Sequence, residues 1–330
     1  LDPLWLSSGI LIITYAILLS EMVHRTVIAL TGAGMVIISG LLDQDRAIAG
    51  IDFNTIALLT GMMMIVAVIR TTGFFEYIAI WSAKKVKADP RGVLIVLSIV
   101  TAVFSAFLDN LTTVLLVVPI ALLLAEKLEV SPYPFLMSQI LASNIGGTAT
   151  LIGDPPNILI GSATGLTFTD FLFHMGPVVA VVLVVSLYAF HLIWGKSLVA
   201  TDEHKARIMG FREQDSITDK KLLVQSLTVL VLVILGFIIG EHYHIRPGTT
   251  AMTGAAVLLL VVGLNDTMEA QSERLHEVFS EVEWGALFFF MGLFVVVGGV
   301  EHAGLLEILG AKLMAATNNA IVINTVVMAK

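Results

Sequence analysis

Two short polar stretches interrupt long apolar runs, and they hold the side chains most suited to binding a small solute. The first runs from Ser105 to Thr113 and contains Asp109, Asn110 and Thr112. Carboxylate and carbonyl oxygens are ligands for hard cations, and the hydroxyl and amide groups could hydrogen-bond a neutral solute. A carboxylate could also exchange a proton. This stretch therefore suits a cation, a proton or a neutral hydroxide.

The second stretch, Ser143–Asn157, reads Ser-Asn-Ile-Gly-Gly-Thr-Ala-Thr-Leu-Ile-Gly-Asp-Pro-Pro-Asn. Its glycines weaken a helix, and Pro155 and Pro156 remove amide donors and clash with the preceding turn. In lipid, the freed backbone groups need partners from protein or water. A proline kink with Gly146-Gly147 packing would explain the break but not Asp154. A phosphate-binding loop would need a preceding strand and a lysine, and both are missing. We expect a broken helix lining a polar cavity.

The composition indicates a lipid environment for these stretches. The chain has 330 residues, of which 57% are hydrophobic and 13% charged, whereas soluble domains carry about 25% charged residues. The apolar runs are continuous, which favours spanning helices. Cysteine is absent, so disulfides and thiolate chemistry are excluded. No basic stripe with interleaved aromatic residues suggests nucleic acid binding. With no nucleophile–base pair or metal triad, we expect no enzyme, no metal and no cofactor.

Apolar runs predict the membrane segments, and several are shorter than the roughly 20 residues of a full span. Short segments are typical of discontinuous helices. Only Asp109 and Asn110 separate the runs Val93–Leu108 and Leu111–Leu124. These two runs could be two spans or a re-entrant hairpin over 93–124. Because an acid must face protein or water, we favour the hairpin. The runs are Leu4–Leu19, Val27–Leu42, Phe53–Ile69, Val93–Leu108, Leu111–Leu124, Phe135–Leu151, Pro177–Trp194, Leu222–Ile239, Thr250–Leu264, Trp284–Val300 and one starting near Ile321.

Lysine and arginine cluster in the loops 70–91 and 196–221, which places both loops in the cytoplasm. The loop 265–283 then also lies inside, and the protein is expected in the cell inner (plasma) membrane. We expect 196–221 to be a solvated connector. Glu76 and Glu307 are expected on interfacial amphipathic segments.

The two halves of the chain resemble each other. Thr31-Gly32-Ala33 recurs as Thr253-Gly254-Ala255, an offset of 222, and Gly61 recurs as Gly292, an offset of 231. The matched segments run in opposite directions, which predicts an inverted repeat; chance matching of glycines is the alternative. The first repeat with its preceding helix is 1–195, including a broken helix at 135–165. A linker at 196–221 and an incomplete second repeat at 222–330 follow. The hairpin's partner would lie beyond Lys330.

The two stretches, and Ser143–Gly161 above all, closely resemble the ion transporter superfamily, in particular its arsenite permease, sodium–proton antiporter and P-protein branch. The resemblance implies an all-α polytopic membrane protein, an inverted repeat with re-entrant hairpins and discontinuous helices, divided into a scaffold and a transport domain. The more distant dicarboxylate branch has Ser-Asn-Thr at the hairpin tip, where this chain has Asp109. The candidate binding residues are Asp109, Asn110, Thr112, Thr113, Asn144, Gly146, Gly147, Thr148, Thr150, Asp154 and Asn157.

Two acids at the site disfavour a free dicarboxylate unless metal ions or protons intervene. A cation or a neutral hydroxide remains. We expect export of arsenite or antimonite in exchange for protons carried by Asp109 and Asp154, and sodium–proton antiport is the alternative. A proton- or sodium-coupled carboxylate or oxyanion carrier is less favoured. The expected partners are the lipid bilayer, the solute and protons; a homodimer and a soluble ATPase subunit remain open.

Overall fold

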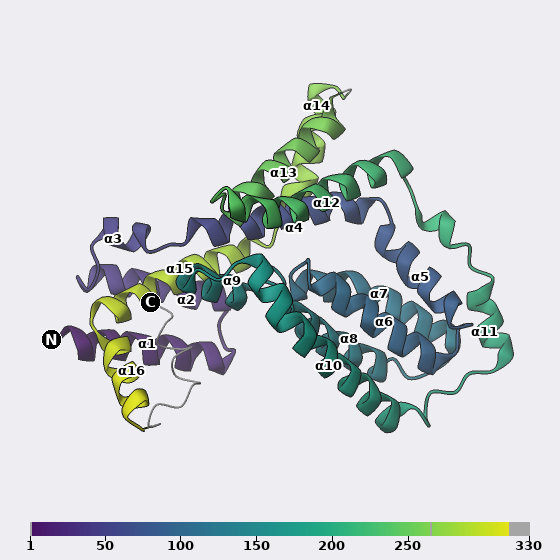
Figure 1. Ribbon diagram of the computed structural model, residues 1–330, viewed down its shortest axis with the longest axis horizontal. Helices are drawn as coiled ribbons and strands as arrows, with labels where there is room; N and C mark the ends of the chain where they lie inside the picture. The colour runs from purple at the N-terminus through teal and green to yellow at the C-terminus, as the bar shows by residue number, and fades with distance from the viewer. Residues whose placement is uncertain (1, 265, 317–330) are drawn as a thin grey trace. The chain divides into compact units, whose positions relative to one another are not determined.

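The computed structural model describes residues 2–264 and 266–316, and every regular element in these ranges is helical (Figure 1). Six of the described helices are long and apolar enough to cross a membrane: α1, α4, α7, α10, α12 and α15. The expected all-α polytopic membrane protein is thereby confirmed. The elements are α1 (Pro3–Ser20), α2 (Arg25–Ile38), α3 (Gln44–Ala49), α4 (Phe53–Thr71), α5 (Phe74–Lys85), α6 (Pro90–Ser105), α7 (Asn110–Leu128), α8 (Tyr133–Gly147), α9 (Pro155–Thr164), α10 (Phe168–Trp194), α11 (Asp202–Met209), η1 (Glu213–Ser216), α12 (Lys220–His242), α13 (Pro247–Gly263), α14 (Met268–Ser280), α15 (Trp284–His302) and α16 (Leu305–Ala316).

The helices follow the apolar runs closely, with one clear exception. We expected α10 to begin at Pro177, but it begins at Phe168 and carries Pro177 inside. A reciprocal capping box between Thr167 and Asp170 starts the helix earlier. Membrane helices tolerate internal proline because neighbouring groups satisfy the freed carbonyl. The predicted segment followed the apolar run alone.

The polar connections contain more structure than the sequence predicts. The loop 265–283 includes α14, and the linker 196–221 includes α11 and η1. Glu76 and Glu307 lie in α5 and α16, the two short segments where amphipathic helices were expected. The run near Ile321 lies outside the described residues.

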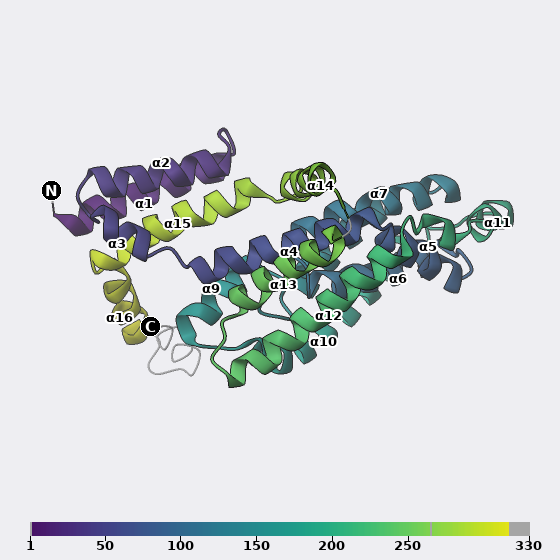
Figure 2. The ribbon, with the colours of Figure 1, turned by 90° about the horizontal axis from the view of Figure 1, so that it is seen from above.

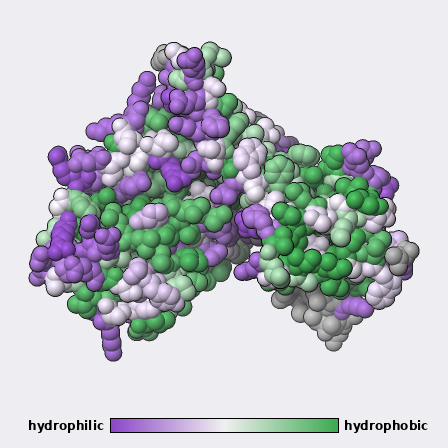
Figure 3. All heavy atoms as spheres, turned by 180° about the vertical axis from the view of Figure 1, so that it is seen from behind, coloured by the Kyte–Doolittle hydropathy of each residue, from purple (hydrophilic) through white to green (hydrophobic). Residues whose placement is uncertain are grey.

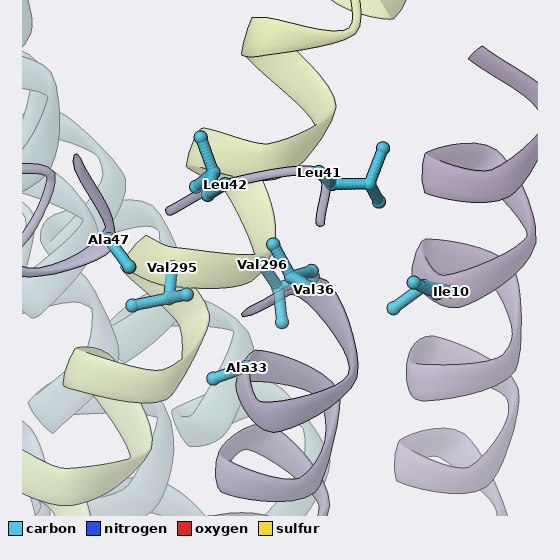
Figure 4. Packing of buried hydrophobic residues seen from close by; sticks show 8 residues of the cluster. All are labelled: Ile10, Ala33, Val36, Leu41, Leu42, Ala47, Val295 and Val296. Atoms are coloured by element: carbon cyan, nitrogen blue, oxygen red, sulfur yellow. The ribbon is translucent and has the colours of Figure 1, made fainter. Parts of the chain in front are cut away.

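The chain forms two compact units. Unit 1 comprises Leu1–Ala57, Ser162–Thr164 and Glu283–Lys330, and in it α2 packs against α1 and α15. A Cβ at Gly292 would lie only 2.7 Å from the carbonyl carbon of Ala29, so α15 and α2 cross at nearly backbone contact. The aliphatic core beside this crossing comprises Ile10, Ala33, Val36, Leu41, Leu42, Ala47, Val295 and Val296 (Figure 4).

Unit 2 comprises Leu58–Gly161 and Gly165–Val282 and contains both polar stretches. Helices α12 and α13 lie side by side (Figures 1 and 2). A Cβ at Gly61 of α4 would lie 2.6 Å from the carbonyl carbon of Ala251 in α13, so these two helices also meet at a glycine. Helices α6, α7 and α8 pack together, and α10 lies against α8 and α6.

The surfaces of the helices suit lipid. Helix α10 exposes Val181, Val184 and Leu192, and only 6% of its most apolar window is buried. Figure 3 shows broad apolar areas on the helices, with hydrophilic residues gathered over α14 at the top of the view. Broad, continuous apolar surfaces are costly in water and favour an apolar medium such as a bilayer.

Candidate functional site

The helix breaks where the sequence predicts it. Helix α8 ends at Gly147, a series of turns covers 148–154, and α9 starts at Pro155. Pro155 and Pro156 occupy the first two positions of α9, where their missing N–H groups leave no intrahelical bond unmade. The proline pair therefore ends one helix and begins the next.

Two buried side chains hold the broken segment together. The Asn157 Nδ2 donates to the carbonyls of Gly147 at 3.2 Å and Thr150 at 2.9 Å. The Thr150 hydroxyl donates to the Ala106 carbonyl and accepts from the amides of Ile152 and Gly153, both at 3.3 Å. These bonds satisfy backbone groups that the break leaves free. Thr150 and the amide nitrogen of Asn157 therefore position the loop.

Asp109 organises the tip between α6 and α7. Its Oδ1 accepts from the Thr112 amide at 2.9 Å and its Oδ2 from the Thr112 hydroxyl at 2.5 Å. The buried Thr113 hydroxyl donates to the Asp109 backbone carbonyl at 2.9 Å. Asp109 is thus the N-cap of α7, and its carboxylate already occupies the positive end of that helix.

The two stretches meet in space. The Asn110 Nδ2 donates to Oδ1 of Asn144 at 3.1 Å. The Ser143 hydroxyl donates to the Asn110 carbonyl at 2.9 Å, and the Ser105 hydroxyl donates to the Ser143 carbonyl at 2.7 Å. Both serines are fully buried. They were missing from the candidate set, although each stands first in its polar stretch, which was the available signal.

The glycines have separate uses. A Cβ at Gly147 would lie 2.9 Å from Oδ2 of Asp154, so only glycine leaves room for that carboxylate. A Cβ at Gly146 would lie 2.1 Å from the Ala102 carbonyl oxygen, so Gly146 lets α8 approach α6. Gly153 approaches the Gly147 carbonyl in the same way. Gly147 therefore shapes the site, and Gly146 and Gly153 permit the packing beneath it.

The arrangement favours positive charge. Asp109 lies within coulombic range of Asp154, and Thr148, whose hydroxyl donates to the Asn144 carbonyl at 2.9 Å, stands at the carbonyl end of α8. A helix C-terminus carries partial negative charge. The amide end of α7 is capped by Asp109, and α9 begins with two prolines that have no N–H. Each helix N-terminus therefore offers fewer amides to an anion, since Asp109 takes the Thr112 amide in α7 and the prolines of α9 have none.

The rest of the described chain offers no competing metal centre. In residues 2–264 and 266–316, no three His, Asp or Glu side chains gather as a metal site would require. His242 ends α12 and His244 follows it in a turn. The polar break in unit 2 is therefore the site on which a function can be built.

Comparison with known proteins decides the family. A family model described as a citrate transporter matches residues 15–329. The chain belongs to the citrate transporter family. It is therefore a membrane transporter rather than an enzyme, and its resemblance to the ion transporter superfamily is confirmed at this level. The arsenite permease branch is not tested by these comparisons.

The relatives of this chain include proteins named as a transporter, as a membrane protein and as a P protein. An uncharacterized transporter of Mycobacterium tuberculosis is 43% identical over 297 residues, which are 89% of this chain and 67% of the relative. A 46 kDa membrane protein of Mycobacterium leprae is 41% identical over 295 residues, 88% of this chain and 67% of the relative. The P protein of Homo sapiens is 30% identical over 383 residues, covering 93% of this chain and 45% of the P protein. The P-protein part of the resemblance is thereby confirmed.

Proposed function

We propose that this transporter is a secondary active carrier that exports arsenite or antimonite in exchange for protons, with Asp109 and Asp154 as the proton-carrying groups. One observation carries the proposal: Asp154 lies at the break between α8 and α9, beside the C-terminus of α8, and Asp109 at the tip between α6 and α7 lies within coulombic range of it. Such a site binds protons or cations in preference to anions.

Arsenite fits this site because it is a neutral triol near pH 7. Its hydroxyls can donate to carboxylate oxygens and accept from an amide such as Asn144, whose side chain is exposed beside Asn110. The chain contains no cysteine, so no thiolate would trap trivalent arsenic and prevent its release. Binding through hydrogen bonds alone keeps the solute exchangeable.

The family's description favours a second candidate, a citrate carrier. Citrate carries several negative charges near pH 7, and placing it beside Asp109 and Asp154 would be opposed by like-charge repulsion. A divalent cation bound to citrate, or protonation of the two acids, would remove that repulsion. In this candidate the site therefore takes citrate only together with a divalent cation or with protons on the two acids. Sodium–proton antiport is the third outcome, since carboxylates and backbone carbonyls are also sodium ligands.

Transport in proteoliposomes separates these candidates. Purified protein would be assayed for uptake of arsenite, of sodium and of citrate with and without Mg²⁺, each with and without an imposed pH gradient. Arsenite flux driven by the pH gradient supports the proposal. Sodium flux without arsenite flux would support sodium–proton antiport instead. Citrate flux that requires a cation would support the citrate carrier instead. Absence of all three fluxes with folded protein would contradict the proposed site chemistry.

We further propose that α6 and α7 form a re-entrant hairpin and that the chain carries an inverted repeat. Matched contacts support the repeat: Gly61 meets Ala251 within unit 2, and Gly292 meets Ala29 within unit 1. The offset of 231 relates Gly61 to Gly292, and the offset of 222 relates Ala29 to Ala251, so the two contacts are equivalent under the repeat.

Cysteine labelling tests the hairpin directly, because the chain has no cysteine of its own. Single cysteines replace Gly92 and Glu126, one in each arm, and an impermeant maleimide is applied to each side of the membrane. Both positions should react from the cytoplasmic side. Reaction from opposite sides would mean that the two helices cross the membrane as separate spans.

A further inference from the structure

Residues 198–218, here called the strap, lie along unit 2 instead of extending into solvent. We expected a solvated connector, but Leu198 is 3% exposed and Ile208 is fully buried. Helix α11 packs against α5 and α7, and η1 packs against α5. The strap therefore bridges the end of α4, helix α5 and the base of the α6–α7 hairpin. By the predicted orientation this is the cytoplasmic face.

One edge of the strap is attached to α4 and α5 by directional bonds. The Thr218 amide donates to the Thr72 carbonyl at 3.1 Å, and its hydroxyl donates to Thr71 at 2.8 Å. These carbonyls end α4 and need external partners. Lys84 donates to the Phe211 carbonyl at 3.0 Å and to Glu213 at 2.6 Å. This hydrogen bond holds the pKa of Glu213 below its ordinary value.

Steric fit strengthens the same edge. Gly73 has a φ of 74°, and a Cβ there would lie 1.8 Å from the Ser216 carbonyl oxygen. Only glycine allows both this backbone conformation and this approach. The α4–α5 corner is therefore shaped to receive the strap.

The other edge reaches the hairpin base and is weaker. Glu129, the C-cap of α7, accepts from Arg207 at 3.1 Å and lies 3.3 Å from Nε2 of His204, but its side chain is 58% exposed. Arg91, in the first turn of α6, reaches the Leu198 carbonyl at 3.4 Å. Exposed ion pairs contribute only about 0–1 kcal/mol. The polar contacts of this edge are therefore weaker than those that attach the strap to α4 and α5.

The hairpin also meets α5 through the rings of Phe74, Phe75 and Phe104, with centroids 5.1 to 6.0 Å apart. Aromatic packing of this kind is not tied to one register, and packed helices slide past each other by small shear steps. The ion pairs between the strap and Glu129 fix one position of the hairpin relative to α5. They therefore distinguish the conformation seen here from a shifted one.

We propose that the strap is a conformational latch: it stays attached to α4 and α5 and releases the base of the α6–α7 hairpin when the hairpin shifts during transport. The proposal rests on the proposed carrier function, because it assumes that the hairpin tip at Asp109 moves during transport.

Cross-linking tests the release. Cysteines replace Glu129 and Arg207, and a short, reducible bis-methanethiosulfonate reagent joins them. Solute flux should fall at least tenfold and recover after reduction. The control pair replaces Arg212 and Asp215, which face each other within the strap at 3.9 Å; joining these should leave flux unchanged. Unchanged flux with Glu129 and Arg207 joined would overturn the latch.

A second measurement needs no solute. Leu111, next to the tip and 39% exposed, becomes a single cysteine for an impermeant maleimide. In the parent, the cysteine at position 111 reacts more slowly from one side of the membrane than from the other. Glu129→Gln should raise the slower rate about fivefold, which corresponds to a loss of about 1 kcal/mol. Asp215→Asn should leave the rate unchanged. Equal rates in both variants would overturn the latch. A change in labelling without arsenite, sodium or citrate flux would contradict the proposed function while leaving the latch in place.

Discussion

Two helix crossings in this transporter use the same packing device for different ends. In unit 1, α15 crosses α2 where Gly292 meets Ala29; in unit 2, α8 crosses α6 where Gly146 meets Ala102. Small residues let helix backbones approach closely in membranes, where lipid supplies no hydrophobic force between helices. Glycine contact is therefore common to both crossings and does not by itself mark a functional site.

The two crossings differ in what surrounds the glycine. The α2–α15 crossing is lined by aliphatic side chains, among them Val36 and Val296. The α6–α8 crossing carries fully buried polar side chains, in which Thr101 donates to Gln139 and Ser105 to the Ser143 carbonyl. We call this set the polar seam; its members are Ser98, Thr101, Ser105, Ser138, Gln139 and Ser143.

The seam leads to the broken helix and the apolar crossing does not. Ser143, at the end of the seam, holds the carbonyl of Asn110 at the hairpin tip. Buried polar groups in a membrane protein are stable only when every group has a partner, and no buried side-chain nitrogen or oxygen in the described chain lacks one. Such a network fixes one register between α6 and α8, which keeps the two polar stretches together.

The largest expected effect comes from the acids beside the seam. Asp109→Asn and Asp154→Asn keep the side-chain size and remove the charge, so folding should survive while pH-driven flux falls about a hundredfold, as for loss of a proton-transferring group. The control is Glu301→Gln, an exposed acid in α15. Full flux with unchanged pH dependence in either aspartate variant would remove that residue from the coupling role.

The second effect is on both crossings. Gly146→Ala would place a Cβ 2.1 Å from the Ala102 oxygen, and Gly292→Ala would place one 2.7 Å from the Ala29 carbonyl carbon. Overpacking of this kind costs about 1–3 kcal/mol, so both variants should lower the thermal midpoint in detergent. Only Gly146→Ala should also weaken solute binding, because α8 carries Asn144. Gly34→Ala, where a Cβ meets nothing within 4 Å, is the control. Equal loss of solute binding in Gly146→Ala and Gly292→Ala would contradict the idea that only the α6–α8 crossing supports the site.

A third test separates polar from apolar packing. Thr101→Val alone leaves the buried Gln139 oxygen without its donor and should cost about 1–3 kcal/mol. Gln139→Leu alone should cost less, because the Thr101 hydroxyl keeps its bond to the Leu97 carbonyl. The double variant should cost clearly less than the sum of the singles. In the apolar crossing, Val36→Ala and Val296→Ala leave no polar group unpaired, so each single loss comes from cavity formation, and the double variant should show no comparable recovery. Thermal unfolding of the parent and the six variants completes both cycles. Equal recovery in the two double variants would contradict the difference between polar and apolar packing.

The smallest effect is expected at Ser143. Ser143→Ala removes one hydrogen bond to the Asn110 carbonyl, worth about 0.5–1.5 kcal/mol, and should weaken solute binding by about tenfold or less. Ser39→Ala removes a comparable bond to Val36 at the end of α2 and should leave binding unchanged. Isothermal titration with the solute identified by flux would measure both. A Ser143→Ala protein that binds as tightly as the parent would show that the seam does not position the tip.

Much of the site was predictable because its signals are local. Pro155-Pro156 breaks a helix wherever it stands, and Asp109 followed by Thr112 forms an N-cap from its own segment. The contact of Asn110 with Asn144 was not predicted, since it depends on how α7 packs against α8. The start of α10 was missed because the prediction followed the apolar run from Pro177, whereas the capping box at Thr167 starts the helix before that run.

The roles within the site could not be read from residue type alone. Thr150 and Asn144 carry equally suitable side chains, yet Thr150 is fully buried against Ala106 while Asn144 is exposed beside Asn110. Which face of a broken segment turns inward depends on the helix packed against it. The strap was missed for the same reason, since Ile208 and Leu198 lie in a hydrophilic stretch and their burial depends on α5 and α7.

The sequence by itself determined that this protein is a helical membrane protein, where its helix breaks and which polar groups stand at the break, because these follow from hydrophobicity, proline geometry and the need to satisfy backbone groups in lipid. Only the tertiary structure decided that Gly147 makes room for Asp154, that Ser105 and Ser143 link the two stretches, and that residues 198–218 bind the end of α4. Each of these depends on the close approach of segments far apart in the chain, and local propensity carries no information about such distances.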